Sequence, residues 1–265
     1  MTQLEQRSHQ VWEETKAFPV RSLGQLLNET FAIYGKRFKR IIGLVALVQV
    51  PVGLLGLIPG VGVVTFVALL VVGLLATIAV YGVTISAVGQ HYLTGEIGIG
   101  SSYARVWWRV VSLALLALIL APLLVLGAAS LILFFPAVAL LGVAVPAVVL
   151  EGRGPAAALR RAFEIVQGSW LRVSGIALVI LLVMIGLGLL VQTPFALASG
   201  IAAPEGTSAL GSLFQFAGGL LVGIVTPPVA AIAFTLLYYD LRIRGEGYDL
   251  RALSQEMGVA VATPA

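Results

Sequence analysis

Two carboxylates of this chain lie where a long apolar segment meets a polar one. Glu151 ends an apolar run and precedes Pro155, a residue that suits the first position of a helix. A carboxylate there is favoured by the positive end of that helix. Asp240 follows two tyrosines and precedes Arg242. We expect both carboxylates to be ion-pair anchors, with a role for Glu151 in proton or substrate handling as the alternative.

Four arginines near these carboxylates have the chemistry to bind phosphate. The planar guanidinium group presents paired N–H donors that match two phosphate oxygens. A lipid-phosphate site is therefore an alternative to simple ion pairing for Arg160, Arg161, Arg242 and Arg244.

Other reactive groups are scarce. The chain has no cysteine, which excludes disulfides, thiolate metal sites and a cysteine nucleophile. Its only histidines are His9 and His91, and Zn²⁺ needs three or four ligands. No glycine-rich segment ends in the Gly-Lys-Ser/Thr of a phosphate loop, and no nucleophile–base pair is recognisable. We expect no catalytic residue, no metal and no cofactor.

The composition indicates a membrane protein. Hydrophobic residues make up 59% of the 265 residues and charged residues 11%, with a mean hydropathy of +1.04. Soluble domains carry about 25% charged residues. A soluble fold of this length could not bury so much apolar surface.

Six apolar segments approach the roughly 20 residues that a membrane-spanning helix needs. The run Val110–Leu150 has 41 residues and would reach about 60 Å as one helix, so it must fold back. We expect its break at Gly127–Ser130, with Phe135-Pro136 as the alternative. The other spans are predicted at Ile41–Ile58, Val63–Val88, Val173–Val191 and Leu213–Tyr239.

The basic residues predict the orientation. All sixteen Lys and Arg lie in four polar segments, Met1–Arg40, Gln90–Arg109, Glu151–Arg172 and Asp240–Ala265. This positive-inside pattern predicts that both termini are cytoplasmic. A bacterial plasma membrane is the expected location, on the resemblance described below. Anionic lipid headgroups are then the expected partners, and other membrane proteins or a homo-oligomer are left open. Nucleic acid is not expected, because the arginines flank spans instead of forming a stripe with exposed aromatics.

Amphipathic segments suggest an internal repeat. Ser22–Lys39 and Pro155–Trp170 have helical apolar spacing and are expected to lie on the cytoplasmic membrane surface, with Ser22 as a cap. They match at a constant offset of 132 residues, and Ser101–Arg109 is a shorter third copy at best. The identities are Leu27 with Leu159, Phe31 with Phe163, Ile33 with Ile165, Arg40 with Arg172, and Gly43 with Gly175. The chain is thus expected to hold three units of an interfacial helix and a two-span hairpin.

Polar residues inside the predicted spans are expected to serve packing. The Pro227-Pro228 pair frees helix carbonyls, and Thr226 is positioned to bond one of them. A packing kink is the favoured interpretation, and a broken helix lining a binding site is the alternative. Gln49, Gln192 and Gln215 are expected to form hydrogen bonds between helices.

Three stretches resemble one known family. They read SLGQLLNETFAIYGKRFKRIIGL from Ser22, VPAVVLEGRGPAAALRRAFEIVQGSWLRV from Val145, and LLYYDLRIRGEGYDL from Leu236. Over residues 20–252 they are similar to the membrane domain attached to some glycerophosphoryl diester phosphodiesterases, which also occurs alone. The phosphodiesterase activity of the fused proteins resides in a separate barrel, for which this chain has no room. The resemblance therefore implies no hydrolase activity.

The sequence thus predicts an all-α, polytopic membrane protein with about six transmembrane helices and two to three interfacial helices. Residues 1–20 and 253–265 are expected to be mobile cytoplasmic tails around a membrane domain at 21–252. The favoured function is a non-catalytic scaffold, accessory or membrane-homeostasis protein. The alternative is a transporter or binder of lipids or small molecules that uses the arginines, and an intramembrane enzyme is least favoured.

Overall fold

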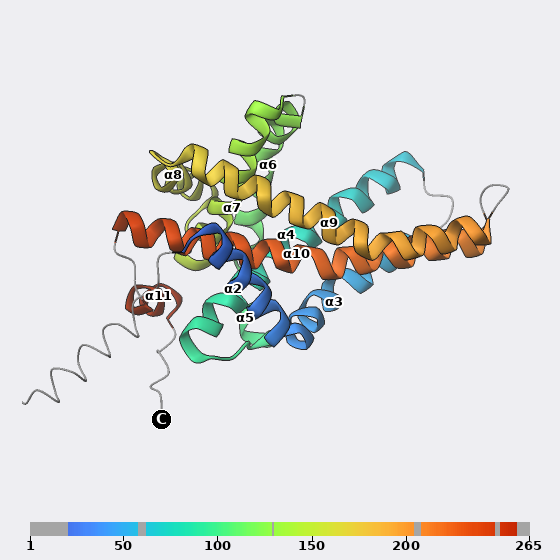
Figure 1. The fold of residues 1–265 in the computed structure, drawn as a ribbon, viewed down its shortest axis with the longest axis horizontal. Helices are drawn as coiled ribbons and strands as arrows, with labels where there is room; N and C mark the ends of the chain where they lie inside the picture. The colour runs from blue at the N-terminus through green and yellow to red at the C-terminus, as the bar shows by residue number, and fades with distance from the viewer. Residues whose placement is uncertain (1–20, 58–61, 129, 204–207, 247–249, 259–265) are drawn as a thin grey trace, which may run out of the picture.

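The structure is a computed structural model that describes residues 21–57, 62–128, 130–203, 208–246 and 250–258. Within these ranges the regular secondary structure is entirely helical (Figure 1), which confirms the predicted all-α class. The helices are α2 (Leu23–Lys36), α3 (Phe38–Leu55), α4 (Val63–Thr94), α5 (Ile99–Trp107), α6 (Val110–Ala128), α7 (Leu131–Glu151), α8 (Pro155–Val166), α9 (Trp170–Ala202), α10 (Ala209–Glu246) and α11 (Leu250–Met257).

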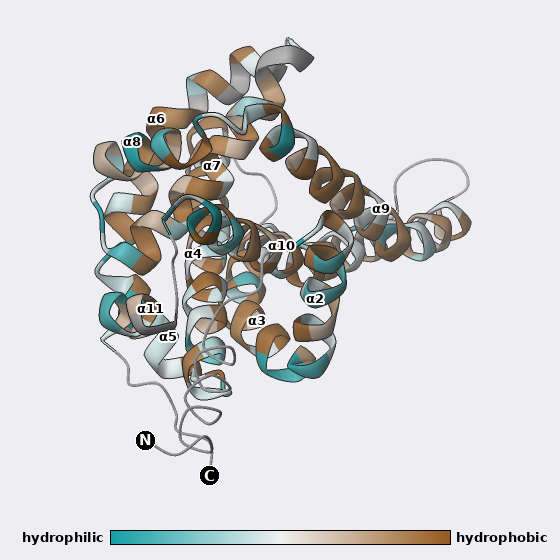
Figure 2. Ribbon diagram, turned by 60° about the vertical axis from the view of Figure 1, so that its left-hand side comes forward, coloured by the Kyte–Doolittle hydropathy of each residue, from teal (hydrophilic) through white to brown (hydrophobic). Residues whose placement is uncertain are grey.

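The helix order repeats a three-part unit. A short helix is followed by two long ones in α2–α3–α4, in α5–α6–α7 and in α8–α9–α10. The hairpin of α9 and α10 runs along the longest dimension of the molecule, whereas the hairpin of α6 and α7 projects in another direction (Figure 1). Hydrophilic residues gather on α2 and α8, and the outer length of α9 is largely hydrophobic (Figure 2).

The first and third units share one register. Leu23 and Pro155 begin their short helices 132 residues apart, and Phe38 and Trp170 begin the next helices at the same separation. The buried residues obey this offset too. They are Leu26 with Ala158, Thr30 with Ala162, Tyr34 with Val166, Ile41 with Val173, and Leu44 with Ile176. The same helix faces are therefore buried in both units.

The middle unit follows the same pattern more closely than its sequence indicated. Val110 begins α6 at a position 72 residues after Phe38. At this offset the buried residues again coincide. They are Ser102 with Thr30, Val106 with Tyr34, Leu113 with Ile41, and Leu116 with Leu44. Burial is retained where residue identity is not, because packing needs an apolar face and tolerates many side chains on it.

Five described helices are long and apolar enough to cross a membrane. The number is six if α5 and the first part of α6, which meet at 64°, form one broken span. The break in the long apolar run lies between Ala128 and Leu131, as expected. The capping prediction is also confirmed. Ser22 Oγ accepts a hydrogen bond from Gln25 N at 3.3 Å, and the Gln25 side chain accepts one from Ser22 N at 2.8 Å.

The C-terminal segment differs from the prediction. Residues 250–257 form α11, which contacts α4 and α7 and buries Leu253 and Met257. The prediction that a mobile tail begins at residue 253 was wrong for residues 253–257, which belong to this packed helix. A helix of eight residues with two buried apolar side chains is too short to show a clear helical periodicity in the sequence. The expected tails at 1–20 and 259–265 lie outside the described residues.

Helix α10 is the central element of the structure. It contacts α2, α3, α4, α7, α8 and α9. All of its residues from Pro228 to Arg242 are buried. A helix that is buried on every side has no solvent-facing stripe. Its polar groups must therefore find partners within the protein.

The proline pair of α10 receives help from α3. Pro227 cannot bond the carbonyl of Gly223, and Gln49 Nε2 donates a hydrogen bond to this oxygen at 3.2 Å. Thr226 Oγ1 has no hydrogen-bond partner, so the predicted role of Thr226 was wrong. The prediction for the glutamines is confirmed, because Gln192 of α9 also donates to Gln215 of α10 at 2.9 Å.

A double-mutant cycle measures this inter-helix bond. Gln49→Leu should lower the free energy of unfolding by about 1 kcal/mol, because it leaves the Gly223 carbonyl without a donor. The loss should shrink in a Pro227→Ala background, where residue 227 regains its N–H. Unfolding in mixed micelles gives the four values. Thr226→Val is the control and should change little, whereas equal losses for Gln49→Leu in both backgrounds would contradict the assignment.

Candidate functional site

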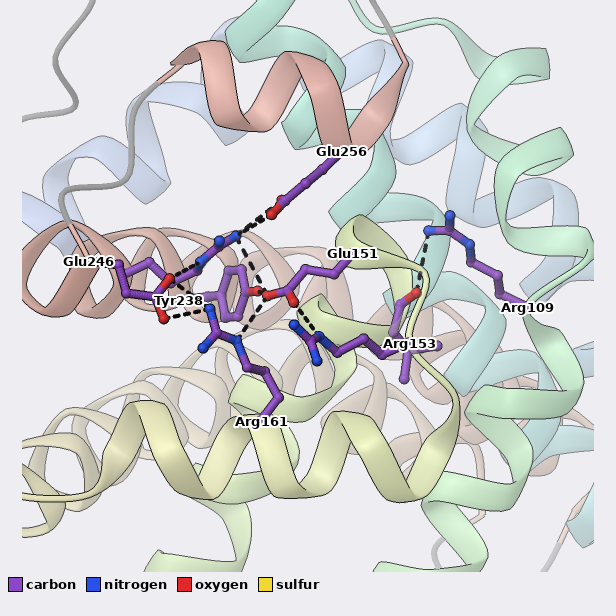
Figure 3. Close-up of polar contacts among 9 residues, drawn as sticks. Arg109, Glu151, Arg153, Arg161, Tyr238, Glu246 and Glu256 are labelled. Carbon is purple, nitrogen blue, oxygen red and sulfur yellow. Dashed lines mark hydrogen bonds and ion pairs between the residues drawn. The ribbon is translucent and has the colours of Figure 1, made fainter.

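The polar residues at one end of α10 form two networks. We call the first the Glu151 cluster, and Figure 3 shows that its side chains converge from α7, α8, α10 and α11. Its members are Glu151, Arg153, Arg161, Tyr238, Arg242, Glu246 and Glu256. These residues join segments that are about 100 positions apart in the chain.

Glu151 lies at the centre of this cluster, and its side chain is only 5% exposed. Its carboxylate accepts hydrogen bonds from the Tyr238 hydroxyl and from Arg153 Nε. Arg161 Nε lies 3.4 Å and Arg242 Nη1 3.5 Å from its Oε1 (Figure 3). Four donors thus compensate for the water that a buried carboxylate loses.

Arg242 extends the cluster to α11. Its Nη1 donates to both carboxylate oxygens of Glu256, at 2.9 and 3.0 Å, and its Nε donates to Glu246 at 3.1 Å. Arg161 Nη2 also reaches Glu246, at 2.6 Å. Burial is the largest single influence on Arg161 and disfavours its charged form, but the hydrogen bond to Glu246 and the nearby charges of Glu151 and Glu246 together outweigh it and raise the pKa of Arg161. The cluster holds three arginines and three carboxylates, so its formal charges balance.

The turn after α7 brings Glu151 to α8. Gly152 has a φ of +72°, in the left-handed region that favours glycine at a helix C-terminus. Pro155 then starts α8, as predicted, with Gly154 as its cap residue. Arg109 Nη1 donates to the carbonyl of Val148 at 3.3 Å, in the last turn of α7 (Figure 3). This short reversal places Arg161 beside Glu151.

The second network, the Asp240 cluster, lies on another face of α10. Its side chains are Asp240, Arg172 of α9 and Arg244 of α10. Asp240 is 1% exposed and accepts from Arg172 Nη2 at 2.8 Å and from Arg244 Nε at 2.9 Å. Arg21 N also donates to Asp240, at 2.7 Å. Arg172 and Arg244 in turn donate to the Arg21 carbonyl, at 3.3 and 3.0 Å.

The side chain of Arg21 continues this network to α2 and α4. It donates to Glu29 of α2, with an Nη2–Oε1 distance of 3.0 Å, and to the Tyr92 hydroxyl at 3.2 Å. Tyr92 also donates to Glu29. Burial disfavours the charged form of Glu29, but the hydrogen bonds from Arg21 and Tyr92 outweigh it and lower the pKa of Glu29.

The four arginines predicted as one phosphate site do not all meet. Arg161 and Arg242 are held by the Glu151 cluster, while Arg244 belongs to the Asp240 cluster. The side chain of Arg160 is 84% exposed and pairs with Glu164 at 3.0 Å. Arg160 and Arg161 point to different faces of α8, because neighbours in a helix are about 100° apart. The predicted ion-pairing of Glu151 and Asp240, by contrast, is what the structure shows.

Sequence reasoning missed several partners in both networks. One of these contacts could have been predicted locally, because Arg242 and Glu246 are four positions apart on one helix. The other partners meet only in the folded chain. They are Arg21, Glu29, Tyr92, Arg172 and Glu256, whereas Arg153 pairs with Glu151 only two positions away.

The histidine considered for metal binding, His91, adjoins Tyr92 but forms a hydrogen bond with no described member of either network. His91 Nδ1 is 3.1 Å from the carbonyl of Gly95. Across the described ranges, no group of three His, Cys, Asp or Glu residues could hold a metal ion. Nothing in the described geometry therefore points to a metal site.

Comparison with known proteins adds no identity. No family model, no curated protein and no solved structure matches this chain. The resemblance to the phosphodiesterase membrane domain thus rests on the three quoted stretches alone. The function has to be argued from the two networks and from the surface around them.

The Glu151 cluster should be important for stability. Glu151→Gln should lower the free energy of unfolding by about 3 kcal/mol, because it leaves buried arginines without their shared carboxylate. Glu164→Gln is the matched control and should cost under about 0.5 kcal/mol, because its ion pair with Arg160 is exposed. Unfolding of both variants in the same micelles provides the measurement. Equal effects would show that the cluster does not hold the helices together.

The lowered pKa of Glu29 predicts acid sensitivity. A carboxylate whose pKa is depressed by folding adds stability above its unfolded pKa, here near the ordinary value of 4.5. That stability is lost as the pH falls through the lower folded pKa. Glu29→Gln should therefore reduce the loss of stability between about pH 5 and about pH 3. Unfolding midpoints across this range test the prediction, and a loss as large as in the unmodified protein would refute it.

Proposed function

We propose that this multi-pass membrane protein is a non-catalytic scaffold or accessory component of the bacterial plasma membrane. One observation carries the proposal. The two carboxylates with the best claim to chemistry, Glu151 and Asp240, are almost fully buried and held by arginines from other helices. Groups that are saturated in this way join helices, and they are not presented to a substrate.

The proposal places the charged end of the molecule in the cytoplasm. The positive-inside distribution of Lys and Arg supports this orientation. Aromatic side chains at the junctions between short and long helices support it as well, because aromatic residues concentrate at membrane boundaries. Those exposed there include Phe38, Trp107, Trp108 and Phe163. In this orientation α2, α5 and α8 would present their outer faces to the cytoplasm.

The outer face of α8 is the strongest candidate for a contact with another protein. Arg160, Phe163 and Glu164 are exposed there. Exposed phenylalanine and arginine side chains are both enriched at protein interfaces, which have a polar rim. The apolar outer surfaces of the long helices are suited to lipid instead.

Lipid or small-molecule binding is the second candidate function. The four arginines first considered for it are divided between two networks and α8, so that site is not retained. One groove beside the Asp240 cluster supports a narrower form of this candidate, which the next subsection develops.

Native mass spectrometry of the protein in native-membrane nanodiscs tests the scaffold proposal. We expect a second membrane protein in a fixed stoichiometric ratio. The double variant Arg160→Glu, Glu164→Arg should release it without moving the unfolding midpoint, because this exposed pair contributes little stability. Leu221→Ala, on the outer surface of α10, is the control and should retain the partner. Spectra with only this chain and lipid, or substrate turnover by the purified protein, would refute the proposal.

A further inference from the structure

An open groove lies where α2 and α9 begin and α10 approaches its end. It is lined by Ser22 and Leu23 of the α2 terminus, by Leu171, Arg172 and Ile176 of α9, and by Arg244 of α10. The groove adjoins the Asp240 cluster but lies outside the buried carboxylate. Gly175 and Arg21 also line it, but Arg21 is 2% exposed and pairs with Glu29, so the exposed cations are Arg172 and Arg244, beside apolar side chains.

The cations of this groove are not balanced by the carboxylate behind them. Arg172 and Arg244 share Asp240 as their ion-pair partner, and their side chains remain 37% and 38% exposed. Two guanidinium groups thus share a single negative charge, whereas the charges of the Glu151 cluster balance. Asp240 fixes both arginines from the buried side. Their excess positive charge faces the groove.

Donors remain on both arginines for a ligand. Arg172 uses Nη2 for Asp240 and the Arg21 carbonyl, and Arg244 uses Nε and Nη2 for the same two acceptors. Within the described ranges, Arg172 Nε and Nη1 and Arg244 Nη1 have no protein acceptor. Prearranged guanidinium donors of this kind suit the oxygens of a phosphate group. The positive end of α2 at Leu23 adds to the attraction.

An apolar strip leads from the arginines along α9. Leu171 is 93% exposed, and Gly175 follows one turn later with open space where a side chain would be. Leu178 and Leu182 continue on the same face at helical spacing. A phosphate held by the arginines would therefore have an apolar surface beside it. This is the chemistry of a phospholipid, whose headgroup phosphate is attached to acyl chains.

We propose that this groove binds the phosphate of an anionic phospholipid through Arg172 and Arg244, with an acyl chain along Leu171 and Gly175. The site differs from the four arginines singled out in the sequence, since it uses Arg172 and excludes Arg160, Arg161 and Arg242. It does not depend on the scaffold proposal, because none of the exposed α8 residues Arg160, Phe163 and Glu164 lines the groove.

Lipid titrations of the full-length protein, read by native mass spectrometry, test the site. Phosphatidylglycerol should bind at one saturable position, more tightly than phosphatidylcholine. Arg172→Gln should weaken this binding about tenfold, the equivalent of one good ionic contact. Equal retention of the two lipids would overturn the proposal.

A second pair of variants separates binding from folding. Gly175→Phe fills the groove and leaves both arginines in place, and it should also weaken phosphatidylglycerol binding about tenfold. Gly43→Phe is the matched control, since Gly43 of α3 corresponds to Gly175 in the first unit and also has open space around it, but lies outside the groove. Equal affinities of the two variants would overturn the site.

Soluble competitors identify the source of the phosphate. Inorganic phosphate and glycerol 3-phosphate should displace phosphatidylglycerol only at concentrations far above those of the lipid, because they lack the acyl chain that covers Leu171. Displacement at equal concentrations would overturn the lipid assignment and make the ligand a soluble phosphate compound.

Discussion

Charged side chains on a fully buried helix are the constraint on which this structure depends. Asp240 and Arg242 lie in the continuously buried part of α10, where losing water costs each ion several kcal/mol unless partners replace it. Residues 238, 242 and 246 form one i,i+4 row, and residues 240 and 244 form another on the opposite face. The first row requires α7, α8 and α11, and the second requires α2 and α9. The demand for partners thus gathers most of the other helices around one end of α10.

The three repeated units, each a short helix followed by two long ones, provide the framework around α10. Each unit buries the same face of its short helix and of the long helix that follows, so the three units share a packing rule. They differ in their polar positions. Arg40 of the first unit forms a long, exposed pair with Glu96 at 3.8 Å, whereas the corresponding Arg172 reaches the buried Asp240. The repeats therefore supply the framework, and their differences create both the ionic networks and the groove beside α9.

The proline pair in α10 also leaves a polar group that needs a partner from another helix. The carbonyl that Pro227 leaves open is bonded by Gln49 from α3, not by the neighbouring Thr226. In a medium without water an open carbonyl needs a donor, and an amide from a packed helix can reach it where a residue one turn away is directed elsewhere. The proline pair is therefore a point where two hairpins are joined, which agrees with a packing kink more closely than with a broken helix around a ligand.

The sequence by itself determined the class of the protein, the hairpin break near Gly127–Ser130, the starts of α2 and α8, and the register that relates the first unit to the third. These features follow from local rules, because the length of an apolar segment, a helix cap and a helical periodicity each depend only on residues that are close in the sequence. Only the tertiary structure decided which charges meet. Arg172 finds Asp240 across 68 positions, Glu256 reaches Arg242 from a helix that looked like a tail, and Arg160 and Arg161 part although they are adjacent. Ion pairing depends on which faces pack together, and side-chain direction changes by about 100° with each helical residue, so linear proximity does not determine it.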